Sequence, residues 1–93
     1  MEEKEKYHAE IDAKLIKFGE TLNEIKTKAE QRKKNLSEIG IDGTLRKHKN
    51  AKVKLEQLKQ SDENTWQDYK VHLDDQVNDI NEELRKAMAY FAQ

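Results

Sequence analysis

The sequence predicts an all-α protein: an antiparallel helical bundle or coiled coil of three unequal helices, at about residues 3–39, 44–60 and 62–91. Three observations support this. The 93 residues include no proline, Lys, Glu, Ala, Leu and Gln dominate, and 40% of the residues are charged. Apolar residues make up only 34% of the chain, and they recur with helical spacing, so each helix can bury one narrow stripe. We expect a single helical domain over residues 1–93.

The first predicted helix carries a regular heptad stripe, in which apolar residues alternate at spacings of four and three. Its members are Ile11, Leu15, Phe18, Leu22, Ile25, Ala29, Arg32, Leu36 and Ile39. Arg32 is the one charged member, and Tyr7 extends the stripe by one turn toward the N-terminus. The spacing therefore predicts one helix from about residue 3 to about residue 39.

A change of phase after residue 39 predicts a turn at 40–43. A straight helix would continue the stripe through Gly43, Arg46, Asn50, Val53 and Gln57, of which only Val53 is apolar. The apolar residues of this segment lie in a different register instead. They are Ile41, Leu45, His48, Ala51, Leu55 and Leu58. Gly40 suits the left-handed position after a helix, and Asp42 or Thr44 suits the N-cap of the next one.

The third helix is predicted to begin in the sequence "SDENTW". Ser61 is a suitable N-cap, and Asp62 and Glu63 would place negative charge in the first helical turn. The apolar spacing would also allow an unbroken helix here, with Asp62 on the stripe. The capping residues are therefore the only sequence evidence for a break between the second and third helices. The stripe beyond it has a mean spacing close to 3.6 residues. Its members are Trp66, Tyr69, Leu73, Val77, Ile80, Leu84, Ala87 and Phe91.

Charge is segregated along the chain although the net charge is −1. Residues 1–25 carry 4 basic and 7 acidic side chains, residues 26–59 carry 11 and 4, and residues 60–93 carry 3 and 8. A basic middle segment between acidic ends favours a chain that folds back on itself, so that unlike charges meet along the helix flanks. Each exposed pair contributes only about 0–1 kcal/mol, so charge favours the antiparallel arrangement more than it stabilises it.

The residue types argue against a metal site or a cofactor. The chain has no cysteine and three scattered histidines, His8, His48 and His72. Glu5 and His8 have the Glu-x-x-His spacing of di-iron bundles, but those sites require the motif twice. His48 lies on the apolar stripe of the middle helix, so we expect a hydrogen-bonded core histidine there.

The sequence also predicts no catalytic residues and no enzyme activity. Ser37 and Ser61 stand near predicted helix ends, where hydrogen bonding to the backbone explains them. Asp74 and Asp75 are adjacent in sequence and point about 100° apart on a helix. The sequence "GIDG" lacks the length and the following Lys-Ser/Thr of a phosphate-binding loop.

Two basic runs, "QRKK" (31–34) and "RKHKNAKVK" (46–54), raise the question of nucleic acid. Nine of the eleven basic residues in the segment 26–59 are lysines, and no aromatic residue is interleaved. We favour the interpretation that these basic residues form a solvated face whose charge complements that of the acidic third helix. Binding of a polyanion such as nucleic acid through 26–59 is the alternative.

No stretch approaches the ~18 uninterrupted apolar residues of a membrane span, and the first ten residues lack the apolar region of a secretory signal. The chain "KAMAYFAQ" (86–93) is the most apolar stretch, but it ends an acidic helix that anionic lipid would repel. We expect a cytoplasmic protein without a membrane span.

The segment "KLEQLKQSDENTWQDYKVHLDDQVNDINEELRKAMAYF" (54–91) resembles the C-terminal half of small bacterial coiled-coil proteins of unassigned function. The matching residues are Leu55, Leu58, Lys59, Ser61, Trp66, Lys70 and Phe91. "FGETLNEIKTKAE" (18–30) is similar to their N-terminal helix, with Phe18 in place of a tryptophan. Tyr69, Thr65 and the "GIDG" insertion depart from the pattern. The resemblance implies a coiled coil without catalytic residues, and some members are described as stress-responsive.

These observations together predict a non-catalytic structural or protein-interaction module that forms a homodimer or docks a partner helix. We expect the short middle helix to leave Phe18, Ile80 and Leu84 half covered in a monomer, and exposed apolar stripes are typical of a partner site. A twofold, antiparallel dimer would place each open stripe on that of its mate.

Overall fold

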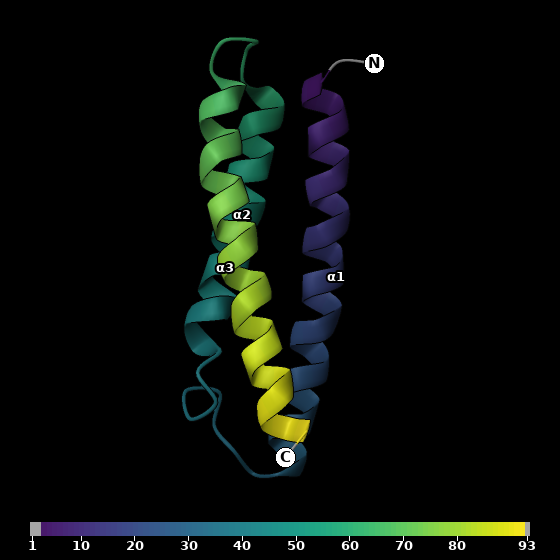
Figure 1. Ribbon diagram of the computed structural model, residues 1–93, viewed down its shortest axis with the longest axis vertical. Helices are drawn as coiled ribbons and strands as arrows, with labels where there is room; N and C mark the ends of the chain where they lie inside the picture. Colours follow the sequence, from purple (N-terminus) through teal and green to yellow (C-terminus); the bar gives the residue numbers. More distant parts are fainter. Residues whose placement is uncertain (1–2, 93) are drawn as a thin grey trace.

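The computed structural model describes residues 3–92, which form three α-helices: α1 (Glu3–Gln31), α2 (Asp42–Gln60) and α3 (Trp66–Ala92). The chain descends along α1, returns along α2 and descends again along α3 (Figure 1). Helix α2 is therefore antiparallel to its two neighbours, and α1 and α3 run parallel. The bundle measures 47 × 20 × 16 Å. The predicted all-α bundle of three unequal helices is confirmed, while residues 1, 2 and 93 of the predicted domain lie outside the described residues.

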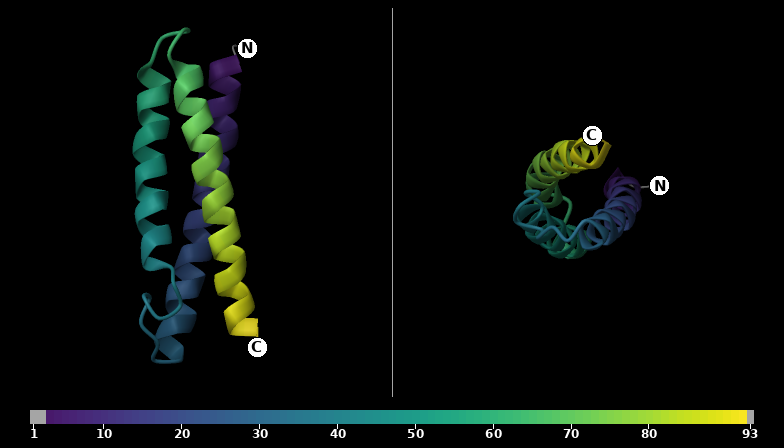
Figure 2. Two further views of the ribbon diagram at one scale, coloured as in Figure 1. Left: turned by 60° about the vertical axis from the view of Figure 1, so that its left-hand side comes forward. Right: turned by 90° about the horizontal axis from the view of Figure 1, so that it is seen from below.

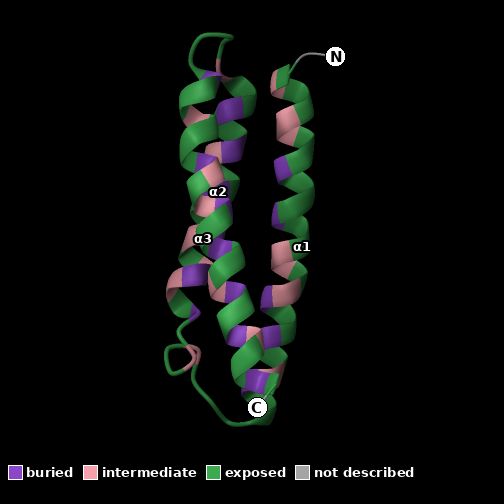
Figure 3. Cartoon of the chain, viewed as in Figure 1, coloured by how far each residue is buried: buried purple, intermediate pink, exposed green. Residues whose placement is uncertain are grey.

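The three predicted stripes face one another and form one hydrophobic core along the length of the bundle (Figure 3). Burial follows the predicted spacing closely, because most stripe members are buried and most of the residues between them are exposed. The buried apolar residues are Ile11, Leu15, Leu22, Ile25, Ala29, Ile41, Ala51, Leu55, Leu58, Trp66, Leu73, Val77, Ile80, Leu84, Ala87 and Phe91. Each helix thus contributes a single face, and its other faces remain in solvent.

Helix α1 ends at Gln31, so the prediction that it continues to residue 39 is wrong. The amide N–H of Lys34 donates to the carbonyl of Ala29 at 2.8 Å, and that of Lys33 donates to Glu30 at 3.1 Å. This pair of bonds is a Schellman motif, which requires a left-handed residue after the helix. Lys33 takes that position, with a φ of 54°. Glycine usually fills this position, so the lysine at residue 33 does not indicate a helix end.

The connection between α1 and α2 therefore spans residues 32–41 rather than 40–43 (Figure 2). Its apolar residues still belong to the hydrophobic core. Ile41 is fully buried, and Leu36 and Ile39 are partly buried and pack against the core. Gly40 adopts the left-handed conformation expected of it, with a φ of 78°. The amide of Ile41 then donates to the carbonyl of Leu36 at 3.1 Å, which closes the turn before α2.

Neither predicted cap of α2 is used. The N-cap is Ile41, and no side chain bonds to the first turn of the helix. Thr44 is buried and its hydroxyl donates to the carboxylate of Glu83 on α3. The buried position of Ile41 thus fixes the start of α2 in place of a polar cap.

The predicted break between the second and third helices is present, but its residues have different roles from those expected. Ser61 ends α2 instead of capping α3, because its hydroxyl donates to the carbonyl of Leu58 at 2.6 Å. The carboxylate of Asp62 accepts the N–H groups of Asn64 and Thr65, each at 2.9 Å. Hydrogen bonds from Thr65 and Asn64 hold the pKa of Asp62 below its usual value. Helix α3 begins at Trp66 rather than at residue 62.

Truncation of a stripe residue to alanine is expected to destabilise the bundle strongly. Leu22 and Leu73 have exposed fractions of 2% and 0%, and Leu→Ala in a packed core costs about 2–5 kcal/mol. Val53→Ala is the matched control, because Val53 is 52% exposed and surface substitutions stay within about 0.5 kcal/mol. Urea unfolding measures all three variants. Losses below about 0.5 kcal/mol at both leucines would contradict the assigned core.

Two glycine substitutions are expected to act in opposite directions. A Cβ at Gly19, in the middle of α1, would lie 3.5 Å from Cε1 of His48, an ordinary contact. Gly19→Ala should therefore stabilise the protein by about 0.5–1 kcal/mol through helix propensity. Gly40→Ala should cost about 1 kcal/mol because of its left-handed backbone. Thermal unfolding compares the two, and the same sign for both would contradict the structure.

Candidate functional site

His48 is a structural link between α1 and α2, as expected for a histidine on the stripe. Its side chain is buried, and its Nε2 lies 2.7 Å from the carbonyl oxygen of Leu15. Since a carbonyl only accepts, the ring nitrogen carries the proton of this bond. The ring lies beside Gly19, where a Cβ would be 3.5 Å from Cε1 and 3.7 Å from Nε2.

The other histidine considered for a metal site, His8, lies at a hollow between α1 and α2. Lys4, Glu5, His8 and Lys59 line it, so two cations accompany the single carboxylate. Among residues 3–92 no group of three or more His, Asp or Glu side chains is placed to hold a metal ion. The hollow therefore has a donor set poorly suited to a cation.

Helices α2 and α3 are joined by a polar cluster on their flank. Glu83 accepts hydrogen bonds from the ammonium of Lys47 and the hydroxyl of Thr44. Burial raises the pKa of Glu83, but the hydrogen bonds from Lys47 and Thr44 outweigh it and hold the pKa below its usual value. The hydrogen bond that Lys47 donates to Glu83 in turn raises the pKa of Lys47. Within residues 3–92 this is the one ion pair that joins two helices, so charge segregation yields fewer direct pairs than its pattern suggests.

Tyr7 ties α1 to α3 at the end of the bundle where α1 begins. Its hydroxyl donates to the carboxylate of Asp74 at 2.6 Å, and the carbonyl of Lys70 lies 3.2 Å away. Its ring packs on Trp66 with 6.0 Å between centroids. Burial of the phenol and its bond to Asp74 raise the pKa of Tyr7 well above the usual range. We call this contact the tyrosine tie.

Arg32 ties the same two helices at the opposite end, which explains the charged member of the first stripe. Its guanidinium donates to the backbone carbonyl of Phe91 at 2.8 Å and lies 5.1 Å from the centroid of the Phe91 ring. A cation at the last carbonyls of α3 also complements the helix dipole. We call this contact the arginine tie.

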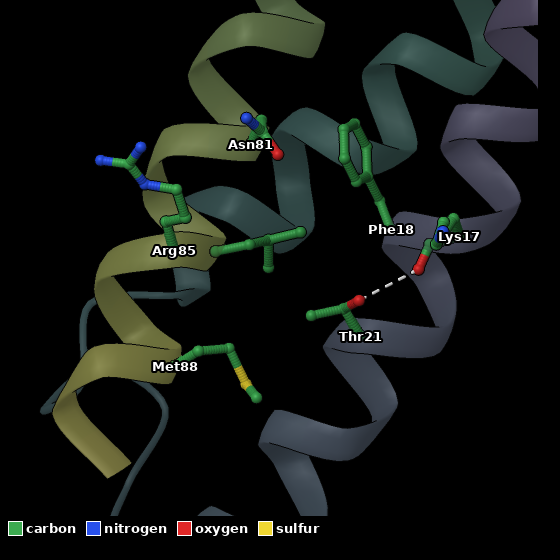
Figure 4. Close-up of a pocket in the computed structure, with 7 residues that line it drawn as sticks. Lys17, Phe18, Thr21, Asn81, Arg85 and Met88 are labelled. Carbon is green, nitrogen blue, oxygen red and sulfur yellow. Dashed lines mark hydrogen bonds between the residues drawn. The ribbon is translucent and has the colours of Figure 1, made fainter. Parts of the chain in front are cut away.

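A groove of about 270 Å³ lies between α1 and α3, on the stretch between the two ties. The residues that line it are Lys17, Phe18, Thr21, Asn81, Leu84, Arg85 and Met88. Figure 4 shows Phe18 and Met88 directed into the space between the two helices, with Arg85 on the outer rim of α3 and its side chain directed away from α1. Phe18 and Met88 are only partly buried. The groove therefore presents an apolar floor that the bundle leaves open to solvent.

The expectation that Phe18, Ile80 and Leu84 are half covered holds for Phe18 alone. Ile80 has an exposed fraction of 0% and Leu84 of 4%. Helices α1 and α3 pack directly on each other as well as on α2, so the short length of α2 does not leave these two residues open. The predicted homodimer stays a prediction, with Phe18 and Met88 as its remaining apolar support. The sequence spacing predicted Phe18, whereas Met88, which follows the stripe residue Ala87 by one position, was not predicted.

The basic segment 26–59 extends over α1, the following turn and α2. Lys26 and Lys28 lie on α1, the run 31–34 lies at the helix end and in the following turn, and the remaining basic residues are spread around α2. Lys47 is already engaged by Glu83. Lys26 nevertheless shares one hollow with Lys34 and another with Lys52, and the polyanion alternative stays a prediction.

No protein-family model matches the chain, and no curated protein or solved structure is significantly similar to it. Among residues 3–92, none of the helices has the length and apolar content needed to cross a membrane. The geometry of the groove and its two ties is therefore the available guide to function.

Removal of the Tyr7 hydroxyl is expected to change how stability depends on pH. Because the folded state raises the pKa of Tyr7 above an unfolded value of about 10, its contribution is complete below that pH and is lost as the pH rises further. The free energy of unfolding of the wild type should thus fall more steeply above pH ~10 than that of Tyr7→Phe. Urea unfolding at a series of alkaline pH values measures this. Tyr90→Phe, at an exposed tyrosine, is the control and should match the wild type; equal slopes for all three proteins would contradict the tyrosine tie.

Proposed function

We propose that this protein is a non-catalytic helical interaction module that receives a helix of a partner in the groove between α1 and α3. The observation that carries the proposal is the open apolar floor, where Phe18 and Met88 remain partly exposed. A hydrophobic groove between two helices is a common receptor for one face of an amphipathic helix. Two walls that are already fixed at both ends reduce the entropy lost on binding.

The lining of the groove also supports a binding role over a catalytic one. Its hydroxyl group, on Thr21, donates to the carbonyl of Lys17 at 3.2 Å. No histidine or carboxylate lines the groove beside it, so the hydroxyl has no base to activate it. The remaining polar groups, on Lys17, Asn81 and Arg85, are suited to contact polar side chains that flank the apolar face of a partner helix.

The cellular setting remains part of the proposal. A chain without cysteine fits a reducing cytoplasm, and the resemblance to small bacterial coiled-coil proteins supports a place in a stress response. Self-association through the groove, the predicted homodimer, is one form that the interaction can take.

A photo-cross-linking residue in place of Thr21 tests the proposal in the cells that make the protein. Thr21 lines the groove and is only partly buried, so the probe would reach whatever occupies the floor. The control position is Val53, which is 52% exposed on the part of α2 remote from the groove. We expect discrete adducts from position 21 and none from position 53, with peptide mapping that places the adduct on a helix.

The mass of the adduct identifies the class of partner. An adduct at twice the mass of the chain would indicate a homodimer, and any other discrete mass a different protein. Equal adducts from both positions, or none from position 21, would contradict the proposed function.

A further inference from the structure

We propose that the partner helix is acidic: an amphipathic helix of another protein, with apolar residues on one face and Asp or Glu side chains along both edges of that face. This inference rests on the proposed function and adds the chemistry of the partner. The charge of the groove carries it. The two charged residues that line the groove are both cations, one on each wall, and no carboxylate lines it.

Both rim cations are available for a partner. Lys17 makes no ion pair within residues 3–92. Arg85 has one partner, Glu82 on its own helix at 3.8 Å, and their side chains are 73% and 52% exposed. A pair with that geometry and exposure contributes little, so replacing it with a carboxylate of a partner has a low cost. Because the floor of the groove is apolar and non-directional, ion pairs with Lys17 and Arg85 would also set the orientation and register of the partner helix.

The same charges argue against a second copy of the chain as the occupant. A twofold axis along the bundle would place Lys17 opposite Arg85 of the mate, and a twofold axis across the bundle would place each cation opposite itself. Both arrangements bring cations against cations around an apolar contact, which is unfavourable. A groove-to-groove dimer therefore lacks the complementarity that an acidic helix provides.

The apolar floor suits a helix face whose exact side chains vary. Leu84 is buried and forms a fixed base, whereas the unbranched thioether side chain of Met88 adapts to irregular partners. The groove lies between the two ties, which join α1 and α3 toward the two ends of the bundle. They fix the ends of both walls while the middle stays accessible.

Two synthetic peptides of about 16 residues, long enough for a helix of about 24 Å, test the inference. Both carry leucines at spacings of three and four; one has glutamates along the edges of the leucine face and the other has lysines. We expect the acidic peptide to bind the intact protein at least about tenfold more tightly than the basic one, and this preference to shrink at high salt. Fluorescence anisotropy of labelled peptide measures both.

Charge-reversed variants locate the preference. The double variant Lys17→Glu, Arg85→Glu should abolish or invert it, and Lys17→Gln with Arg85→Gln should weaken it with less risk to folding. The control Arg46→Glu, Lys49→Glu makes the same change of charge at two exposed positions of α2 and should leave it intact. Circular dichroism confirms that each variant is folded.

Four results would overturn the inference: equal binding of the two peptides, a preference that survives charge reversal at the groove, no binding of either peptide, and an adduct from position 21 at twice the mass of the chain. The first and second would leave the proposed function standing as an interaction without charge selection. The cross-link from position 21 decides the proposed function independently, since it needs no assumption about the charge of the partner.

Discussion

The structure depends on one constraint: each helix has a single narrow apolar stripe, and all three stripes must be buried together. With 34% hydrophobic residues and 40% charged residues, no helix has a second apolar face, so each helix must contact both neighbouring helices through the same stripe. A slender three-helix bundle with one shared hydrophobic core satisfies the constraint. Ile25, Leu58 and Leu73, one from each helix, are fully buried in this core. The antiparallel course of α2 follows from the two short connections.

Because the hydrophobic core is narrow, polar contacts at the flanks of the helices determine how the helices are positioned relative to one another. His48 joins α1 to α2, and Lys47 with Thr44 joins α2 to Glu83 on α3. Helices α1 and α3 are joined at their ends, by the tyrosine tie and the arginine tie. Between these ties the side chains of Phe18 and Met88 do not close the interface, so the groove is a consequence of the same shortage of apolar residues that shapes the core.

The sequence predicts the stripes, the fold class and the role of His48, because all of these depend on spacing along one helix. It misplaces the end of α1 because Leu36 and Ile39 continue the heptad spacing, while Lys33 adopts a left-handed conformation that its residue type rarely takes. It assigns the cap before α3 to Ser61, whereas Asp62 accepts the N–H groups there and Ser61 ends α2, since both residue types are good caps. The groove was not predicted, because it arises from how two helices that are distant in sequence pack, and Met88 and Arg85 carry no signal of it.

The central claim is that a single chain closes its own three-stripe core. Spin labels on cysteines introduced in place of Asn23 on α1 and Lys49 on α2 test it directly, because the natural sequence has no cysteine and both positions are exposed. Packed neighbouring helices predict a separation within about 20 Å, unchanged when the labelled protein is diluted into excess unlabelled protein. A separation near the ~39 Å of a continuous helix, or a short distance that disappears on dilution, would contradict the claim.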